Sequence, residues 1–153
     1  MIVELDYKHI NYLVKNIDYK DRRKLKSFDI DFKKWLLFHV KQKDMFVYLV
    51  NGNPIAVFGC TADPKNKEFG IMSLVCMKLL KKHPFTFLKN AKKFVDEQKK
   101  KYKILYNYVD SRYCNGKKWL EFCGAKFNNV TFNSKDGVKF EMYTIEGVKN
   151  GYK

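Results

Sequence analysis

The sequence has no apolar run long enough to span a membrane, and its first residues show neither the basic region nor the apolar run of a secretion signal. We therefore expect a protein of the cytoplasm. Its four cysteines form no CxxC pair and share no zinc-site spacing with histidine. Three of them lie in apolar runs, where thiols are usually buried in proteins of reducing compartments. This pattern predicts buried thiols and no metal site.

Acidic residues are also few, since 16 Asp and Glu stand against 31 Lys and Arg and give a net charge of +15. A field of this size attracts anions, so the partner classes to consider are CoA or another anionic ligand, nucleic acid and an acidic protein. A solvated lysine-rich surface explains much of this charge equally well, and no nucleic-acid-binding motif is present. The lysines of the candidate basic face are Lys81, Lys82, Lys92, Lys93, Lys99, Lys100 and Lys101.

Length and composition predict a single domain over residues 1–153, because 153 residues with 46% hydrophobic side chains can bury a sizeable core. The hydrophobic pattern predicts a mixed α/β fold: N-terminal helices, an antiparallel hairpin, a central strand–helix–strand–helix and a C-terminal hairpin. The long central strand and the next one are joined by a parallel crossover. The apolar faces of the expected helices lie in 10–17, 32–40, 87–102 and 119–123, and the expected strands cover 45–50, 55–60, 69–80, 104–109, 127–132 and 138–145.

Two glycine signals fix parts of this order. Asn51-Gly52 tolerates positive φ between two β-prone runs, which predicts a hairpin over residues 45–60. Gly124 follows the last apolar position of a short helix, where a left-handed residue ends such a helix. Residues 103–127 are therefore predicted to form a strand, a polar loop, a helix ended by glycine, and a second strand.

This strand–loop–helix–glycine order resembles the C-terminal half of the GNAT (general N-acetyltransferase) fold. The sequence is most similar to small phage-encoded GNAT-like proteins, such as the internal virion protein A group of short-tailed phages. The resemblance implies a GNAT-like fold, acyl-CoA-dependent N-acetyltransferase activity, and a location in a host cytoplasm or a virion. The motifs that carry it are GNPIAVFG over 52–59, LYNYVD over 105–110 and KWLEFCGA over 118–125.

The resemblance also implies an acetyl-CoA site in the turn after the long strand. In the family, a glycine-rich loop there lets backbone N–H groups reach the CoA diphosphate at a helix N-terminus. Residues 77–86 contain no glycine, and Pro84, which suits a helix start, has no N–H group. Cationic side chains and the helix start around Thr86, a candidate N-cap, would then attract the phosphates. The predicted cofactor-binding residues are Val75, Met77, Lys81, Lys82, His83, Phe85, Thr86, Asn107 and Asn115.

The general acid implied by the resemblance is a tyrosine four residues before the helix-ending glycine, and Leu120 occupies that position here. Tyr113 is the predicted substitute, and Tyr108 is the alternative, although a tyrosine at either position also suits packing. The asparagine that is common near the start of this helix is replaced by Tyr113, with Asn115 two residues further on.

A general base must receive the proton of the attacking amine. Glu68, at the start of the long strand, is the predicted base, and His39 and Asp110 are the alternatives. Each of the three also suits a solvated or capping role. A cysteine nucleophile paired with His39 or His83 has no recognised spacing.

Three functions remain open at this point. The first is an N-acetyltransferase, which the implied fold favours. The second is a GNAT-like protein that has lost catalysis and serves in a phage virion or in contact with a host protein, which the missing glycines and Leu120 favour. The third is a basic binder of nucleic acid or of an acidic partner, whose affinity would fall steeply with salt.

Overall fold

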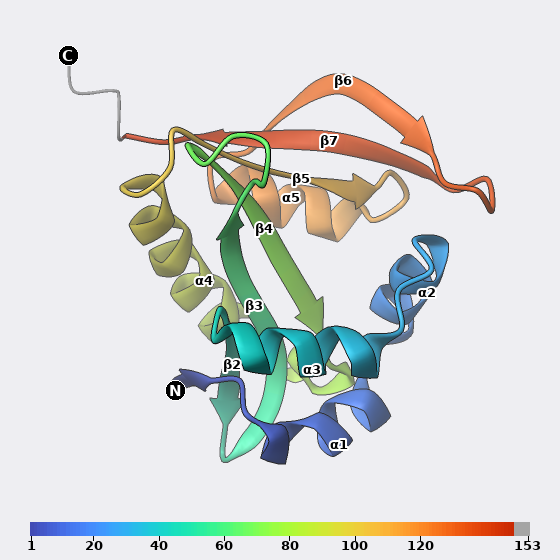
Figure 1. The fold of residues 1–153 in the computed structure, drawn as a ribbon, viewed down its shortest axis with the longest axis vertical. Helices are drawn as coiled ribbons and strands as arrows, with labels where there is room; N and C mark the ends of the chain where they lie inside the picture. The colour runs from blue at the N-terminus through green and yellow to red at the C-terminus, as the bar shows by residue number, and fades with distance from the viewer. Residues whose placement is uncertain (149–153) are drawn as a thin grey trace. The chain divides into compact units, whose positions relative to one another are not determined.

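The computed structural model describes residues 1–148, so the last residues of the predicted domain, 149–153, lie outside the described part. The described residues form a mixed sheet in the order β1-β2-β3-β4-β5-β7-β6, with helices between the strands (Figure 1). This confirms the predicted mixed α/β fold. The strands are β1 (Ile2–Glu4), β2 (Met45–Val50), β3 (Asn53–Ala62), β4 (Phe69–Cys76), β5 (Ile104–Asp110), β6 (Lys126–Asn133) and β7 (Lys139–Glu146). The helices are α1 (Tyr7–Asn16), α2 (Tyr19–Ser27), α3 (Phe32–Gln42), the 3-10 helix η1 (Lys78–Lys82), α4 (Pro84–Lys99) and α5 (Cys114–Phe122).

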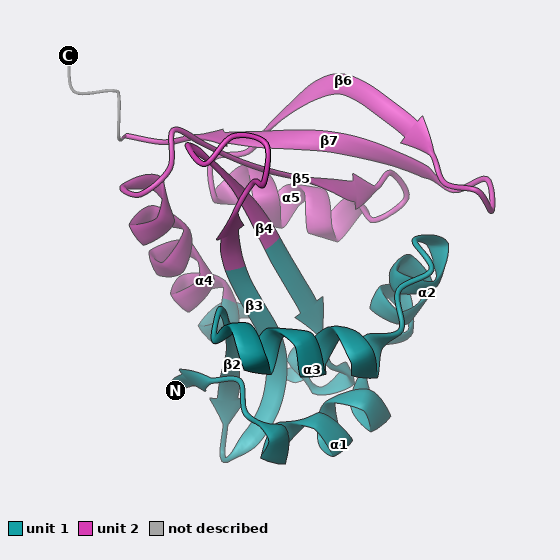
Figure 2. Cartoon of the chain, in the orientation of Figure 1, with its two compact units in different colours: residues 1–59, 73–87 teal, residues 60–72, 88–153 magenta. Residues whose placement is uncertain are grey.

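The chain divides into two compact units (Figure 2). Unit 1 comprises residues 1–59 and 73–87, and unit 2 comprises residues 60–72 and the described chain from 88 onward. The strands β3 and β4 and the helix α4 each run from one unit into the other. Each unit has its own cluster of buried apolar side chains. The single domain over 1–153 stays a prediction.

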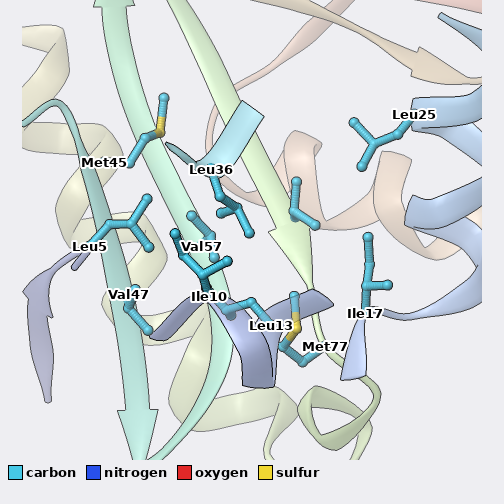
Figure 3. Close-up of a cluster of buried hydrophobic side chains, with 11 residues drawn as sticks. Leu5, Ile10, Leu13, Ile17, Leu25, Leu36, Met45, Val47, Val57 and Met77 are labelled. Atoms are coloured by element: carbon cyan, nitrogen blue, oxygen red, sulfur yellow. The ribbon is translucent and has the colours of Figure 1, made fainter. Parts of the chain in front are cut away.

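The core of unit 1 lies around β2 and β3, which pair antiparallel with Val47 opposite Val57. Asn51 and Gly52 have φ of 51° and 79°, so the predicted hairpin turn is confirmed. The predicted apolar faces of α1 and α3 pack in the same core, where Ile10, Leu13 and Leu36 are buried. Its members are Leu5, Ile10, Leu13, Ile17, Leu25, Leu36, Met45, Val47, Val57, Val75 and Met77 (Figure 3).

A helix that the hydrophobic pattern does not predict, α2, occupies the charged segment after α1. α2 starts after Asp18, whose Oδ1 accepts a hydrogen bond from the N–H of Lys20 at 3.0 Å. A capping carboxylate satisfies an N–H group that the first helical turn would otherwise leave unpaired. Leu25 is 7% exposed and anchors the helix in the core of unit 1. The cap at Asp18 and the burial of Leu25 together stabilise α2, whose sequence is too polar to show the apolar periodicity of a helix.

In unit 2, β7 pairs antiparallel with both β5 and β6, and the first part of β4 runs parallel to β5. α5 ends where predicted, because Gly124 follows it with φ of 101°. Leu105 and Ile145 are almost fully buried in the core of this unit, where Leu120 of α5 also packs.

Two expectations about element ends were wrong. The long strand ends at Cys76 rather than Leu80, because the chain turns into η1 there. Thr86 lies inside α4 and is not its N-cap, since the helix already begins at Pro84. In β7, the buried side chains are Phe140, Tyr143 and Ile145.

Candidate functional site

The turn after β4 lies in unit 1 and contains most of the predicted cofactor-binding residues. Met77 is fully buried, its N–H donates to the carbonyl of Ile55 at 2.9 Å, and it forms an isolated bridge with Ile17. Within η1, the N–H of Leu80 donates to the carbonyl of Met77 at 3.1 Å, and the N–H of His83 to that of Leu80 at 2.9 Å. The positive-φ residues of the described chain all lie outside 77–86. The turn is therefore closed by 3-10 hydrogen bonds and needs no glycine.

Cationic side chains dominate the surface of this turn. Lys81 and Lys82 are exposed, and His83 is partly exposed. The Nζ of Lys81 lies 3.6 Å from Oδ2 of Asp18, so one of these charges is shared with a carboxylate. Phe85 is 84% exposed at the start of α4, and Thr86 is exposed beside it. The turn can thus hold an anion through side chains, whereas the N–H groups of η1 named above already have acceptors.

A buried carboxylate that sequence reasoning missed holds the end of β4. The N–H of Cys76 donates to Oδ2 of Asp21 at 2.9 Å, and the carbonyl of Cys76 accepts from the N–H of Asp18 at 2.9 Å. Burial, the largest cause, raises the pKa of Asp21, while nearby Lys24 opposes the rise. No local signal in the sequence points to this contact, because Asp21 lies among charged residues, 55 positions before Cys76.

Asn107, a predicted cofactor-binding residue of unit 2, bridges two strands. Its Nδ2 donates to the carbonyl of Met72 in β4, and its Oδ1 accepts from the N–H of Tyr108 at 2.7 Å. The parallel ladder next to it joins Ile71 to Tyr106. The side chain of Asn107 therefore continues the link between β4 and β5 one step beyond that pair.

Tyr113 and Asn115 lie at the start of α5 in unit 2. Tyr113 precedes the first helical residue, and Asn115 is exposed. The ring of Tyr113 packs so closely over Gly116 that a Cβ atom there would lie 2.6 Å from its Cδ2. Tyr108, the alternative acid, packs edge-on against Phe132 with ring centroids 4.8 Å apart.

Glu68, the predicted base, lies at the opposite end of β5 from Tyr113. Its carbonyl accepts from the N–H of Lys103, the residue before β5, at 2.7 Å, and its side chain is exposed. Tyr113 follows the other end of this strand of seven residues, and a strand of that length extends about 20 Å. The structure does not bring Glu68 and Tyr113 together.

Both alternative bases have carboxylate or cationic partners. His39 places Nδ1 2.7 Å from Oδ1 of Asp44. Asp110 accepts from the backbone N–H, the Nε and an Nη of Arg112 at 2.9, 3.0 and 2.7 Å. A carboxylate held by three such donors is a weak proton acceptor.

The cysteines whose thiol pKa is raised by burial are poor nucleophiles. Burial raises the pKa of Cys60 to about 12 and of Cys123 to about 11, and it raises that of the fully buried Cys76 as well. The prediction of buried thiols holds for Cys76 and Cys123 and in part for Cys60, whereas Cys114 is exposed. Residues 1–148 contain no group of three His, Cys, Asp or Glu side chains placed to hold a metal ion. No helix in the same range is both long and apolar enough to cross a membrane.

The predicted basic face on α4 carries acids among its lysines. Asp96 lies 3.1 Å from the Nζ of Lys92 and 3.9 Å from that of Lys99, and Glu97 lies 3.0 Å from that of Lys100. These i,i+3 and i,i+4 pairs are typical of a solvated helix face. They reduce the positive field that the sequence predicted there.

A second polar pair that the sequence did not reveal joins the β3–β4 loop to β5. The hydroxyl of Tyr106 donates to Oδ2 of Asp63 at 2.5 Å. This bond raises the pKa of Tyr106 to about 12 and lowers that of Asp63. It fastens the loop to β5 within unit 2.

Comparison with solved structures identifies the fold. The chain aligns with smu.2055 from Streptococcus mutans UA159 at a TM-score of 0.72 and 11% identity, over 95% of this chain and 98% of that one. A GNAT-family acetyltransferase from Bacillus anthracis aligns at 0.72 and 9% identity, over 95% and 93%. A ribosomal-protein-alanine N-acetyltransferase from Brucella melitensis aligns at 0.70 and 8% identity, over 95% and 99%. No protein-family model matches the sequence, and no curated protein matches it.

These likenesses confirm the predicted GNAT fold. The predicted similarity to phage proteins is not tested by them and stays a prediction, as do the assigned site residues.

Proposed function

We propose that this protein is an acyl-CoA-dependent N-acetyltransferase that uses acetyl-CoA. The observation that carries the proposal is the fold, which matches acetyltransferases over 95% of the chain at identities of only 8% and 9%. Because one fold can serve several functions, the residues have to support the chemistry separately.

Acetyl-CoA, when bound, supplies an activated acetyl group and a diphosphate of high negative charge. Lys81, Lys82 and His83 fit that charge, since ammonium and imidazole groups donate charge-assisted hydrogen bonds to phosphate oxygens. Phe85 offers an exposed ring and Thr86 offers a hydroxyl, two and three residues after His83. Contacts through side chains would replace the glycine-loop backbone contacts that the N–H groups of Leu80 and His83, engaged inside η1, do not provide.

In this proposal, the less accessible residues of the predicted cofactor-binding group have a structural role. The side chains of Val75 and Met77 are in the core of unit 1 and fix the end of β4 from which the turn starts. Asn107 holds β5 to β4 through its amide. Asn115, exposed on α5, remains the predicted polar contact in unit 2.

Tyr113 is proposed as the proton donor to the leaving thiolate, which requires a phenol in reach of the sulfur. Glu68 is the acceptor of the amine proton that the sequence predicted. Both roles operate at the same reacting atoms, so a separation of about 20 Å along β5 is compatible with only one of the two assignments. We favour Tyr113, because its ring is fixed against Gly116, whereas the side chain of Glu68 is exposed.

Calorimetric titration with acetyl-CoA tests the proposal on the wild type and on a Lys81→Ala/Lys82→Ala/His83→Ala variant. Binding that weakens at least about tenfold in the variant would support it, since each charged contact is worth about 1 kcal/mol or more. A Lys89→Ala/Lys93→Ala variant of α4 is the control for loss of charge, and it should bind like the wild type. Absence of binding at millimolar acetyl-CoA would overturn the proposal.

A second candidate is a GNAT-fold protein without catalysis, used in a virion or in contact with a host protein. The observation that favours it is the combination of Leu120 at the position of the usual acid with the internally bonded η1 turn. The titration separates the two, because this candidate predicts no acetyl-CoA binding.

A further inference from the structure

The outward side of α2 carries a row of positively charged side chains. Tyr19, Arg22, Arg23 and Lys26 recur at i, i+3, i+4 and i+7, and all four are exposed. We call these four residues the arginine stripe. Only three of the chain's 31 cationic residues are arginine, and two of them stand side by side here.

The two acidic side chains at the start of α2 are engaged away from this face. Asp21, the acidic residue within α2, points to the other side of the helix, where its carboxylate accepts the N–H of Cys76 and is buried. Asp18 caps the helix and pairs with Lys81. On α4, by contrast, Asp96 and Glu97 lie among the lysines.

The arginine stripe also contains a flat surface. The guanidinium of Arg23 lies over the ring of Tyr19, with its Cζ 5.8 Å from the ring centroid, and Tyr19 is 58% exposed. A tyrosine ring and a guanidinium are two of the side-chain planes on which unpaired bases stack, and both tolerate any base. The third arginine, Arg112, lies in unit 2 and is held by Asp110 in a bidentate pair.

We propose that the arginine stripe binds single-stranded nucleic acid, with Arg22, Arg23 and Lys26 on phosphates and Tyr19 stacked on a base. The net charge of +15 would steer such a polyanion to the protein. An acidic peptide satisfies the cations but has no use for the ring. A membrane surface fits less well, because Leu25, the apolar anchor of the helix, is in the core and cannot enter lipid.

This inference does not rest on the acetyltransferase proposal. The stripe lies on α2, and the proposed phosphate contacts of acetyl-CoA lie in the turn after β4. Each can fail without the other, and separate titrations measure them.

The test is fluorescence anisotropy of a labelled 12-nucleotide oligouridine with the full chain, at 50 to 200 mM salt. An Arg22→Gln/Arg23→Gln/Lys26→Gln variant should bind about tenfold more weakly, and its salt slope should be smaller by about 2, since each lost phosphate contact removes about 0.7. The matched control, Lys89→Gln/Lys93→Gln/Lys101→Gln, removes the same charge from exposed positions of unit 2. The control should stay within about twofold of the wild type.

Equal weakening by the two variants, or no binding by the wild type, would overturn the proposal, because binding would then be diffuse or absent. Tyr19→Leu separates the ligand classes: it should weaken oligouridine binding about fivefold or more and leave a 12-residue polyglutamate probe unaffected. Polyglutamate binding as tight as oligouridine, with both unchanged by Tyr19→Leu, would assign the stripe to an acidic peptide instead. Unchanged thermal unfolding shows that the variants are folded.

Discussion

Replacing Gly116 with alanine tests whether Tyr113 acts in catalysis, because it moves the tyrosine ring without removing its hydroxyl. A Cβ atom at Gly116 would lie 2.6, 2.9 and 3.0 Å from Cδ2, Cε2 and Cγ of Tyr113. Carbon atoms pack at about 3.5 Å or more, so the ring has to move by about 0.9 Å. Gly116 is the third residue of α5, where the backbone is helical, and alanine is compatible with that conformation.

The effect on stability should be small compared with the effect on rate. Alanine favours a helix over glycine by up to about 1 kcal/mol, while crowding of the ring costs about 1–3 kcal/mol. These contributions oppose each other, so we expect a net loss below about 2 kcal/mol. A catalytic group displaced by about 1 Å can lose about 100-fold in rate, and Tyr113→Phe, which removes the proton, should lose about 100-fold or more.

The assay is release of free CoA thiol from acetyl-CoA with an amine acceptor selected by screening, at saturating acetyl-CoA. Lys118→Ala, an exposed position on the same helix, is the matched control and should keep the wild-type kcat. If Gly116→Ala and Tyr113→Phe both keep more than half of the wild-type kcat, Tyr113 is a packing residue and its proposed role is refuted. A slow Gly116→Ala variant beside a normal Tyr113→Phe variant would equally refute the role of the hydroxyl, because only the ring would then matter.

Three further predictions concern stability, measured by urea unfolding. The raised pKa of Asp21 means that the folded protein holds this proton more tightly than the unfolded chain, so the wild type should lose stability as pH rises from about 4 through the folded pKa. Asp21→Asn, whose amide oxygen can still accept the N–H of Cys76, should flatten this pH dependence, and equal slopes in the two proteins would contradict the argument. Gly70→Ala should cost about 1–3 kcal/mol, since its Cβ would lie 2.8 Å from Sγ of Cys60, and adding Cys60→Ala should recover part of the loss; additive effects would contradict this packing. Gly124→Ala should cost about 1–2 kcal/mol because φ there is 101°, and a neutral result would mean that the helix end can relax.

The sequence predicted the elements whose signals are local. The hairpin over 45–60 depends on Asn51-Gly52, and the end of α5 depends on Gly124; in each case a residue tolerant of positive φ stands between apolar runs. Such signals involve neighbours along the chain, so no tertiary contact is needed to read them. The element order that follows from them was enough to predict the fold that the structural comparison confirms.

The elements that were missed depend on contacts between distant residues. β1 has three residues and exists through pairing with β2, as Val3 opposite Val47 shows. α2 has little apolar periodicity and depends on a cap at Asp18 and on the burial of Leu25. β4 ends at Cys76, whose N–H and carbonyl bond to residues of the α2 start. Local propensity contains none of this information.

The same division applies to the candidate site. The sequence identified the turn after β4 as the place to look, because the order of elements locates it. It did not identify the bond between Asp21 and Cys76, nor the amide of Asn107 that reaches Met72, because these partners lie 55 and 35 residues apart. The base was placed at Glu68 from its position at a strand start, and only the register of β5 shows that Tyr113 follows the other end.

The absence of glycine after β4 has a structural reason that bears on function. A glycine loop presents unpaired N–H groups to a phosphate, whereas a 3-10 turn uses such groups in its own i+3 bonds, as Leu80 and His83 do here. An anion at η1 therefore meets exposed ammonium and imidazole groups rather than the N–H groups of Leu80 and His83, and such side-chain contacts are screened by salt. It follows that any acetyl-CoA affinity of this chain should depend on ionic strength more steeply than that of a protein with a backbone cradle.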